Sequence, residues 1–188
     1  MKKTKIDEFL QVVDEIYGVY LDSTNGFCCI KEKTESTQKE SCRRSNLTMQ
    51  YLNNRKVFYG KGNPNDPKSY PLHVCTQGEF KKRNEDNGKN YKVIANLCLV
   101  QIYQYWDSHY RNKIAEEIGK KTLEINIMGD LKYFRDSIIH HRGIALENIK
   151  KCKILKWHKV REEINIDREK CEEIIRSIKN QINNLRHH

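Results

Sequence analysis

Residues 127–143 read IMGDLKYFRDSIIHHRG, and this stretch decides the fold of the chain. Ile127, Leu131, Phe134 and Ile138 recur at the three- and four-residue spacing of one helix face, with polar side chains between most of them. Gly143 follows, and glycine ends helices because it accepts a left-handed backbone. The stretch therefore predicts an amphipathic helix that ends in a cluster of Arg and His residues.

Three other segments have helical periodicity. Residues 4–22 place apolar side chains at helical spacing, and residues 91–118 are apolar nearly all round in their first half, which predicts a central helix ending at Gly119. Asp167 can cap a final helix. Its predicted inner face consists of Cys171, Ile174, Ile175, Ile178, Ile182 and Leu185. The predicted fold class is all-α, a helical bundle.

Residues 23–89 break this pattern. The stretch is rich in Gly, Asn, Lys and Ser and contains all three prolines, with only weak helical pieces at 35–53 and 77–84. So long an irregular stretch implies a functional excursion, partial disorder or unrecognised helices. Two short apolar runs at 154–157 and 164–166 predict a small β-hairpin before the last helix. With 188 residues in all, we expect residues 1–188 to form one domain with a long insertion.

Composition favours a polyanionic partner. The chain carries a net charge of +10 and 32% charged residues, which makes nucleic acid the leading candidate, although basic surfaces also serve solubility. We find no apolar run of membrane-spanning length and no apolar signal core, so we expect a cytoplasmic protein that does not contact membranes. Seven irregularly spaced cysteines predict reduced thiols, and His73 with Cys75 lacks the companion pair of a zinc site.

The chemistry concentrates in residues 135–142. Arginine binds phosphate, and histidine exchanges protons near neutral pH, so this cluster suggests phosphodiester chemistry. Arg135 and His140 are five residues apart, which separates them by about 140° around an ideal helix and about 7.5 Å along it. One phosphate meets both only if the arginine side chain curls round the helix, or if two copies of the helix face each other.

A purely structural interpretation fits the same residues. Arg135 would pair with Asp136 or another acidic neighbour, His141 would complete the core, and His140 would cap the helix carbonyls. On helix geometry, His141 falls near the apolar face, whereas His140 points away from it. His140 is therefore the freer candidate for chemistry.

The segment Arg135-Asp136-x-x-x-His140 on a late helix resembles the motif of the HEPN superfamily, in which Arg is followed by a polar residue, three further positions and His. Residues 129–134, 143–145 and 105–111 are similar to flanking segments of such domains, and the resemblance covers about residues 90–185. It implies a helical bundle that cleaves RNA without a metal or other cofactor, as a homodimer whose paired motif helices form one cleft.

The resemblance also implies roles for individual residues. Arg135 would stabilise the extra negative charge when the RNA 2′-hydroxyl attacks the adjacent phosphate, and His140 would transfer a proton at the leaving 5′-oxygen. Asp136 would position one of them. HEPN toxins silenced by nucleotide attachment have a Tyr two residues after the His, where this chain has Arg142, so we do not expect that regulation. His141 and Arg142 become candidate additional phosphate contacts.

Two further groups are candidate RNA contacts. His109 and Arg111 follow Trp106 on the expected central helix and would line the same cleft, although an aromatic-rich helix is more often simply core. Residues 81–83 are three consecutive cations beside Phe80, which suits an RNA strand but is also typical of a solvated face.

The sequence therefore predicts a metal-independent endoribonuclease that acts in antiviral defence, a toxin–antitoxin pair or a stress response. Its expected partners are RNA, a second copy of the chain, and an antitoxin or another protein of a defence system. The alternative is a non-catalytic helical module that binds RNA or protein within a defence assembly, and it predicts salt-sensitive RNA binding without cleavage.

Overall fold

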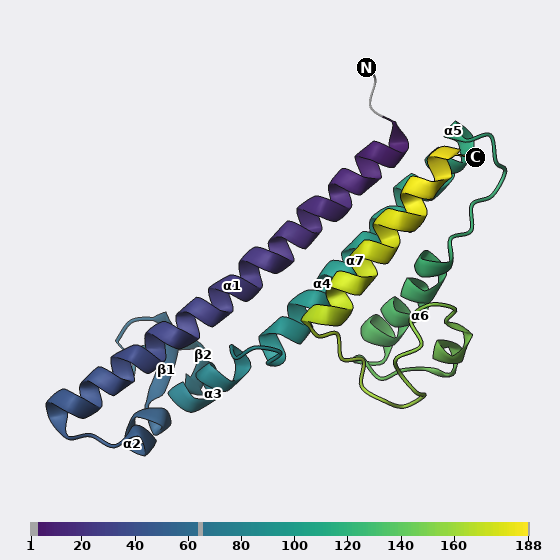
Figure 1. Ribbon diagram of the computed structural model, residues 1–188. Helices are drawn as coiled ribbons and strands as arrows, with labels where there is room; N and C mark the ends of the chain where they lie inside the picture. The colour runs from purple at the N-terminus through teal and green to yellow at the C-terminus, as the bar shows by residue number, and fades with distance from the viewer. Residues whose placement is uncertain (1–3, 64–65, 188) are drawn as a thin grey trace. The chain divides into compact units, whose positions relative to one another are not determined.

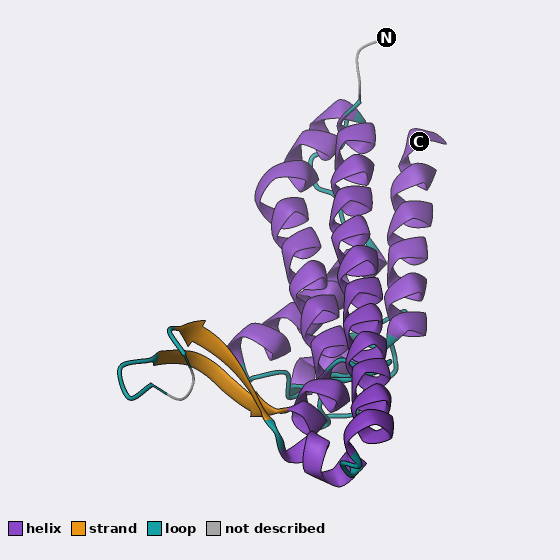
Figure 2. Cartoon of the chain, turned by 90° about the vertical axis from the view of Figure 1, so that its left-hand side faces the viewer, coloured by secondary structure: helices purple, strands orange, loops and turns teal. Residues whose placement is uncertain are grey.

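The computed structural model describes residues 4–63 and 66–187 and is mostly α-helical (Figures 1 and 2). It divides into two compact units. The helical unit contains the residues up to Asp22 and those from Lys92 onward, and the hairpin unit contains Ser23–Tyr91. The hairpin unit thus coincides closely with the stretch expected as an insertion.

The helical unit confirms the helices expected from periodicity. The first part of α1 (Lys5–Ser45) runs alongside α4 (Lys89–Tyr105) and α7 (Arg168–Asn183) in both views, and α6 (Asn126–His140) packs against α7. The remaining helical segments are η1 (Trp106–Tyr110, a π-helical turn), α5 (Arg111–Glu117), and the 3₁₀ turns η2 (Glu147–Lys151) and η3 (Asn184–His187).

The predicted helix ends are also confirmed. Asp167 accepts a hydrogen bond from the Lys170 N–H at 2.9 Å and so caps α7. Gly119 has a φ of +70° just after α5, which is the left-handed conformation expected of a residue that ends a helix.

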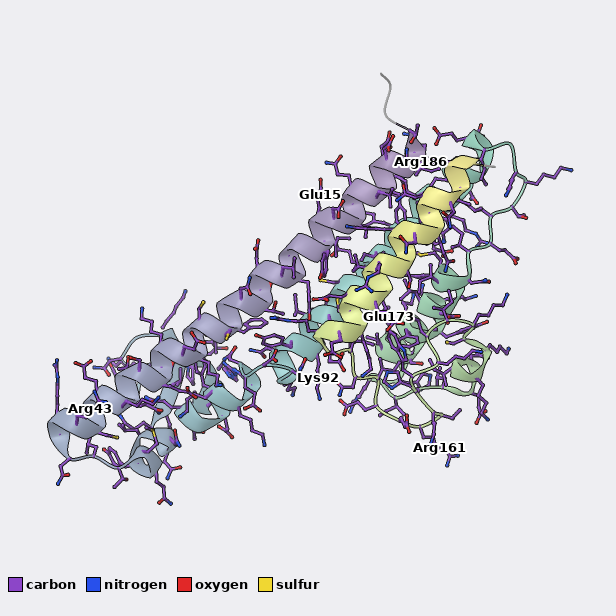
Figure 3. The ribbon with its side chains drawn as sticks, in the orientation of Figure 1. Glu15, Arg43, Lys92, Arg161, Glu173 and Arg186 are labelled. Carbon is purple, nitrogen blue, oxygen red and sulfur yellow. The ribbon has the colours of Figure 1, made fainter. Side chains whose placement is uncertain are left out.

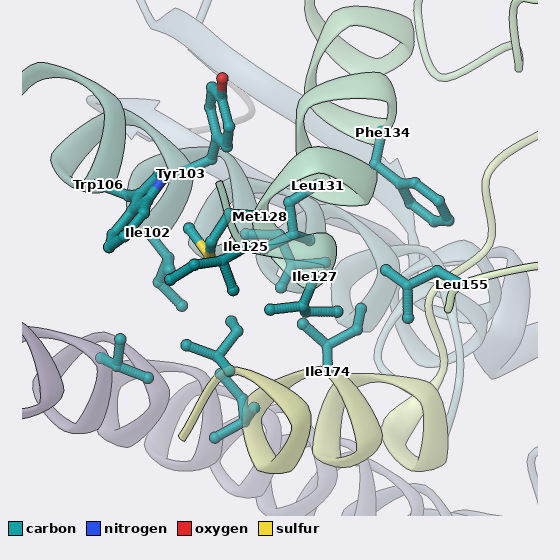
Figure 4. Close-up of a cluster of buried hydrophobic side chains, with 14 of the residues drawn as sticks. Ile102, Tyr103, Trp106, Ile125, Ile127, Met128, Leu131, Phe134, Leu155 and Ile174 are labelled. Carbon is teal, nitrogen blue, oxygen red and sulfur yellow. The ribbon is translucent and has the colours of Figure 1, made fainter. Parts of the chain in front are cut away.

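One apolar core fills the helical unit. Phe9 of α1 is fully buried, and its ring centre lies 5.3 Å from those of both Trp106 and Tyr110. The predicted face of α6 points into this core, since Ile127, Leu131 and Phe134 are buried (Figure 4). Packing between helices rather than local helix propensity therefore provides most of the stability of this unit.

Helix α1 continues far beyond the expected end at residue 22. Its second half lacks an apolar period, which is why the sequence pattern did not reveal it. Ion pairs one turn apart support the helix there: Lys31 with Glu35 at 3.8 Å and Glu40 with Arg44 at 2.5 Å. The helix gives way to Asn46, which has a φ of 49°.

The hairpin unit also contains α2 (Met49–Asn54), β1 (Lys56–Lys61), β2 (Tyr70–Thr76) and α3 (Gln77–Arg83). The strands pair antiparallel, from Lys56 opposite Thr76 to Lys61 opposite Tyr70, and form the hairpin seen in Figure 2. A reciprocal capping box between Thr76 and Glu79 begins α3. The weak helical pieces predicted at 35–53 and 77–84 correspond to the end of α1, α2 and α3. The two strands make the fold mostly α rather than all-α.

The hairpin predicted at 154–157 and 164–166 is wrong. The backbone N–H groups of Lys153, Ile154 and Leu155 donate to the carboxylate of Asp130 at 2.7–2.8 Å, so they do not enter a strand ladder. The Ile164 N–H donates to the Gly143 carbonyl at 2.7 Å, which draws the second run toward the end of α6. Only an isolated bridge, Ile144 with Glu163, forms in this loop.

Charged side chains cover the outward faces of the helices, as Glu15 on α1 and Glu173 on α7 illustrate (Figure 3). Within residues 4–63 and 66–187, none of the helices combines the length and the apolar character needed to cross a membrane.

Candidate functional site

Arg135 lies on α6 at the edge of the core of the helical unit. Its guanidinium carbon is 5.4 Å from the centre of the Tyr103 ring, and its Nη1 donates a hydrogen bond to Asp136 at 2.6 Å. The Arg135 and Asp136 side chains are 25% and 26% exposed. The Nε of Arg135 is buried and has no acceptor among the residues that the structure describes. Solvent thus reaches the guanidinium, which retains an unused donor.

Asp136 changes the geometry of the predicted motif. Asp136 and His140 are four residues apart on a regular helix, so they share a face, whereas Arg135 starts from a different one. The bond from Arg135 to Asp136 draws the guanidinium round the helix toward that shared face. This bond leaves the Arg135 guanidinium without a hydrogen bond to His140 in the described part of the chain. It also places Asp136 where the structural interpretation expected it.

His140, His141 and Arg142 are all exposed at the end of α6. Neither His140 nor His141 has a side-chain hydrogen bond or ion pair within the described part of the chain, so His140 does not cap the helix. His141 does not complete the core, because α6 ends at His140 and the helical projection no longer applies beyond it. Those two elements of the structural interpretation are wrong, while the pairing of Arg135 with Asp136 is confirmed.

Ser137 fixes the chain that follows the motif. Its carbonyl accepts from the N–H groups of His141 and Gly143, and its buried hydroxyl accepts from the Leu146 N–H at 3.3 Å. Arg142 and Gly143 turn the chain with φ values of 52° and 83°. The side chains at the end of α6 are therefore presented on an anchored turn. No sequence pattern indicated this role of Ser137.

The structure separates His109 from Arg111. His109 is exposed on the π-helical turn, against Tyr110 and near the Lys113 ammonium. Arg111 is tied to neighbouring segments: its Nε donates to the Leu123 carbonyl at 2.9 Å, and its Nη1 lies 3.7 Å from Asp107. π-Helical turns in α-helices often accompany functional sites. Of the two predicted residues, only Arg111 lines a cavity among the described residues.

A cavity of about 290 Å³ lies beside this arginine. Arg111, Lys132, Lys151 and Lys153 contribute cations to its lining, and Tyr103 forms part of its wall. Arg135, Asp136 and His140 are not among the described residues that line it. Asp130 also lines it, but this carboxylate is buried and already accepts three backbone N–H groups. Glu124 is the other carboxylate of the lining, so the cavity presents four cations and one further carboxylate to a ligand.

Tyr103 connects the motif with the cavity. Its ring lies under Arg135, and Figure 4 shows its hydroxyl directed away from the apolar cluster. Burial raises the pKa of this hydroxyl, as do the charges of Asp107 and Asp136, while Arg135 and Arg111 oppose the shift. The two arginines predicted as site residues thus act on one phenol. Sequence reasoning missed Tyr103, because no short motif links it to a residue on another helix.

The arrangement offers cationic and proton-transferring groups. Among the described residues there is no cluster of three or more His, Cys, Asp or Glu side chains that could hold a metal ion. All seven cysteines are free thiols, and burial raises the pKa of Cys98 to about 11 and that of Cys152 to about 12. These two thiols are therefore protonated and unreactive near neutral pH.

Comparison of the chain with protein-family models, with curated proteins and with solved structures gave no match.

Proposed function

We propose that the helical unit is an endoribonuclease that cleaves RNA without a metal, by attack of the 2′-hydroxyl on the adjacent phosphate. The 2′-oxygen bonds to phosphorus as the P–O5′ bond breaks; Arg135 stabilises the charge on the phosphate oxygens, His140 protonates the leaving 5′-oxygen, and the 2′-hydroxyl proton passes to water. Asp136 is a positioning residue that holds the guanidinium. His141 and Arg142 add phosphate contacts beside them.

The observation that carries the proposal is the set of contacts around Arg135. A structural arginine uses its donors on protein acceptors, whereas Arg135 keeps a buried Nε without one and remains partly exposed. Its bond to Asp136 brings the guanidinium toward the face of α6 that carries His140. His140 is itself exposed and unbonded within the described part of the chain, as a proton-transfer group must be to reach a substrate.

The proposal includes a homodimer in which α6 helices from two copies face each other. His140 is the last residue of α6 and lies about 7.5 Å along the helix axis from Arg135. A facing α6 from a second copy would bring its His140 closer to this Arg135. Within the shared cleft, each Arg135 then acts with the His140 of the other copy. A role in defence, in a toxin–antitoxin pair or in stress, with the partner proteins that such roles require, remains part of the proposal through the resemblance to HEPN domains.

The test uses purified full-length chain and end-labelled single-stranded RNA in excess EDTA. Arg135→Ala and His140→Ala should each reduce the cleavage rate by about 100-fold or more. Arg176→Ala is the matched control, because Arg176 is exposed on α7 and lies outside the motif, so cleavage should persist. Unchanged cleavage by both motif variants would overturn the assignment.

Mixing the two inactive variants tests the composite cleft. About half of the dimers in an equimolar mixture are mixed, and each has one of its two Arg135–His140 pairs intact, so the mixture should recover about a quarter of the wild-type rate. A mixture as inactive as either variant alone contradicts a cleft shared between copies.

The cationic cavity supports a second candidate, a non-catalytic RNA-binding module. Arg111, Lys132, Lys151 and Lys153 would then hold the phosphate backbone, and binding would weaken as salt rises. This candidate predicts an RNA complex in EDTA without cleavage products, and Lys132→Gln should weaken that complex whereas Arg135→Ala should not.

A further inference from the structure

The hairpin unit contains a second cavity, of about 540 Å³, which is within the usual size of small-ligand sites. Its lining includes Phe27 of α1, Tyr59 of β1, His73 of β2, and Phe80 and Arg83 of α3. All of these residues belong to the hairpin unit, so the cavity is independent of the Arg135 motif.

Arg83 is the cation of this cavity. Its guanidinium lies 5.3 Å from the centre of the Phe80 ring, and its Nη1 is 2.6 Å from the His73 Nε2. Arginine only donates, so His73 accepts this bond as the tautomer that carries its proton on Nδ1. The Arg83 Nε is buried and has no acceptor among the described residues. Only Nη1 is bonded to His73, so the other terminal nitrogen of the guanidinium is the donor that a ligand oxygen in the cavity would meet.

The other walls are aromatic. Tyr59 is 43% exposed, and the centre of its ring lies 6.0 Å from that of the His73 ring. Phe27 is fixed from the other side by Tyr91, with ring centres 5.9 Å apart, and the Tyr91 hydroxyl donates to the Thr24 carbonyl. Flat apolar faces beside one arginine suit a ligand that combines a planar ring with an anionic oxygen.

The charge around the cavity indicates that its ligand is part of a nucleic-acid strand rather than a free small molecule. Residues 23–91 contain 13 Lys and Arg against 7 Asp and Glu. Lys82, on the same helix as Arg83, is exposed and does not line the cavity, so cationic surface continues beyond it. Non-specific single-strand sites combine a basic track with aromatic rings on which bases stack.

We propose that this cavity binds one nucleotide of a single-stranded RNA, with the base against Tyr59 and the phosphate on Arg83. In naming RNA, the proposal rests on the endoribonuclease function proposed for the helical unit. It assigns substrate capture to the hairpin unit and requires no chemistry there.

The test measures binding of a fluorescein-labelled 2′-O-methyl RNA of about 12 nucleotides to the full-length chain by fluorescence anisotropy at about 100 mM salt. The methyl group blocks the attacking hydroxyl, so binding is measured without cleavage. Tyr59→Ala removes a stacking surface and should weaken binding about tenfold. Arg83→Gln removes the charge-assisted phosphate contact and should weaken it by a similar factor.

Two matched controls separate the cavity from general charge and from hairpin stability. Lys82→Gln loses the same charge from the same helix, and Tyr70→Ala loses an exposed tyrosine from the same hairpin. Each should change the affinity by about twofold to threefold at most. Circular dichroism melting of all four variants identifies any variant that has lost its fold.

The proposal is overturned if folded Arg83→Gln weakens binding no more than Lys82→Gln, or if folded Tyr59→Ala weakens it no more than Tyr70→Ala. Adenosine monophosphate that binds as tightly as the oligonucleotide would also overturn it, in favour of a free nucleotide. Arg135→Ala should bind the 2′-O-methyl RNA normally. If the wild-type chain binds the 2′-O-methyl RNA through this cavity but does not cleave unmodified RNA, the endoribonuclease proposal has failed. If it cleaves RNA but the cavity variants bind as well as their controls, the capture proposal has failed.

Discussion

The interior of each unit is stabilised by a different kind of interaction. The helical unit buries a continuous set of aliphatic and aromatic side chains, such as Phe9, Phe134 and Ile174. The hairpin unit buries few large apolar residues, and its interior includes polar side chains, notably Gln38 and Asn84. Apolar burial tolerates some variation in geometry, whereas a buried polar network is stabilising only when every partner is in place. The hairpin unit should therefore be the less stable one.

Each unit also holds an arginine against an aromatic ring, and the partners differ. Arg135 lies over Tyr103 and is paired with the Asp136 carboxylate, whereas Arg83 lies over Phe80 and is bonded to an imidazole. The carboxylate offsets the charge of Arg135 and orients it, while Arg83 keeps its full charge. The first arrangement suits a group that acts on a passing phosphate, and the second suits one that retains a phosphate.

The largest expected effect is in the apolar core. Phe9→Ala removes a fully buried ring that contacts Trp106 and Tyr110, and it should lower the free energy of unfolding by about 4 kcal/mol. Urea unfolding followed by circular dichroism measures the change. Val19→Ala is the control on the same helix, because Val19 is exposed and should change stability little. Equal effects of the two substitutions would contradict the account of the core.

A polar anchor inside the helical unit should matter nearly as much. Asp130→Ala leaves the N–H groups of Lys153, Ile154 and Leu155 without their acceptor and should cost about 3 kcal/mol in the same measurement. Asp130→Asn keeps one oxygen acceptor and should cost less. If both variants are as stable as wild type, these three bonds do not hold the loop.

The polar interior of the hairpin unit should be sensitive to one residue. The buried amide of Gln38 donates to Gln77 at 2.8 Å and accepts from the Lys81 ammonium at 2.7 Å. Gln38→Ala leaves these groups unpaired and should cost about 2 kcal/mol. Hydrogen exchange should accelerate at the amides of α2 and α3 but not at those of α6. Equal acceleration in all three helices would contradict the claim that Gln38 stabilises the hairpin unit specifically.

The smallest effect depends on pH. Burial, followed by the charge of Lys170, lowers the pKa of His158 below its ordinary value of 6.5. The unfolded chain then binds a proton more readily than the folded one, so stability is complete above about pH 6.5 and falls as the pH drops through the lowered pKa. His158→Gln should lose less stability than wild type between about pH 7.5 and pH 5.5. Parallel losses in the two proteins would remove His158 as the cause.

The sequence predicted the helices whose inner faces are apolar. The spacing of Ile127, Leu131 and Phe134 defines α6, because burying that face is what stabilises the helix. The second half of α1 has no such spacing, since ion pairs such as Lys31 with Glu35 support it instead. The β1–β2 hairpin is largely exposed on both faces, so it lacks the alternation by which strands are recognised.

The candidate site was predictable only in part. The motif indicated Arg135, Asp136 and His140 and placed them correctly near the end of a helix. Lys132 lies four residues before Asp136, a spacing that could have added it to the same face. Tyr103 and the second arginine site at Arg83 depend on contacts between distant segments, which a single sequence does not encode as a pattern.

The most direct test of the central claim is the chemical nature of the RNA ends produced by the wild-type chain in excess EDTA. Cleavage through Arg135 and His140 predicts fragments with 2′,3′-cyclic phosphates, and a substrate with 2′-deoxyribose at the cleavage position should remain intact. Fragments with 3′-hydroxyl ends, or the absence of any cleavage by the wild-type chain, would contradict it.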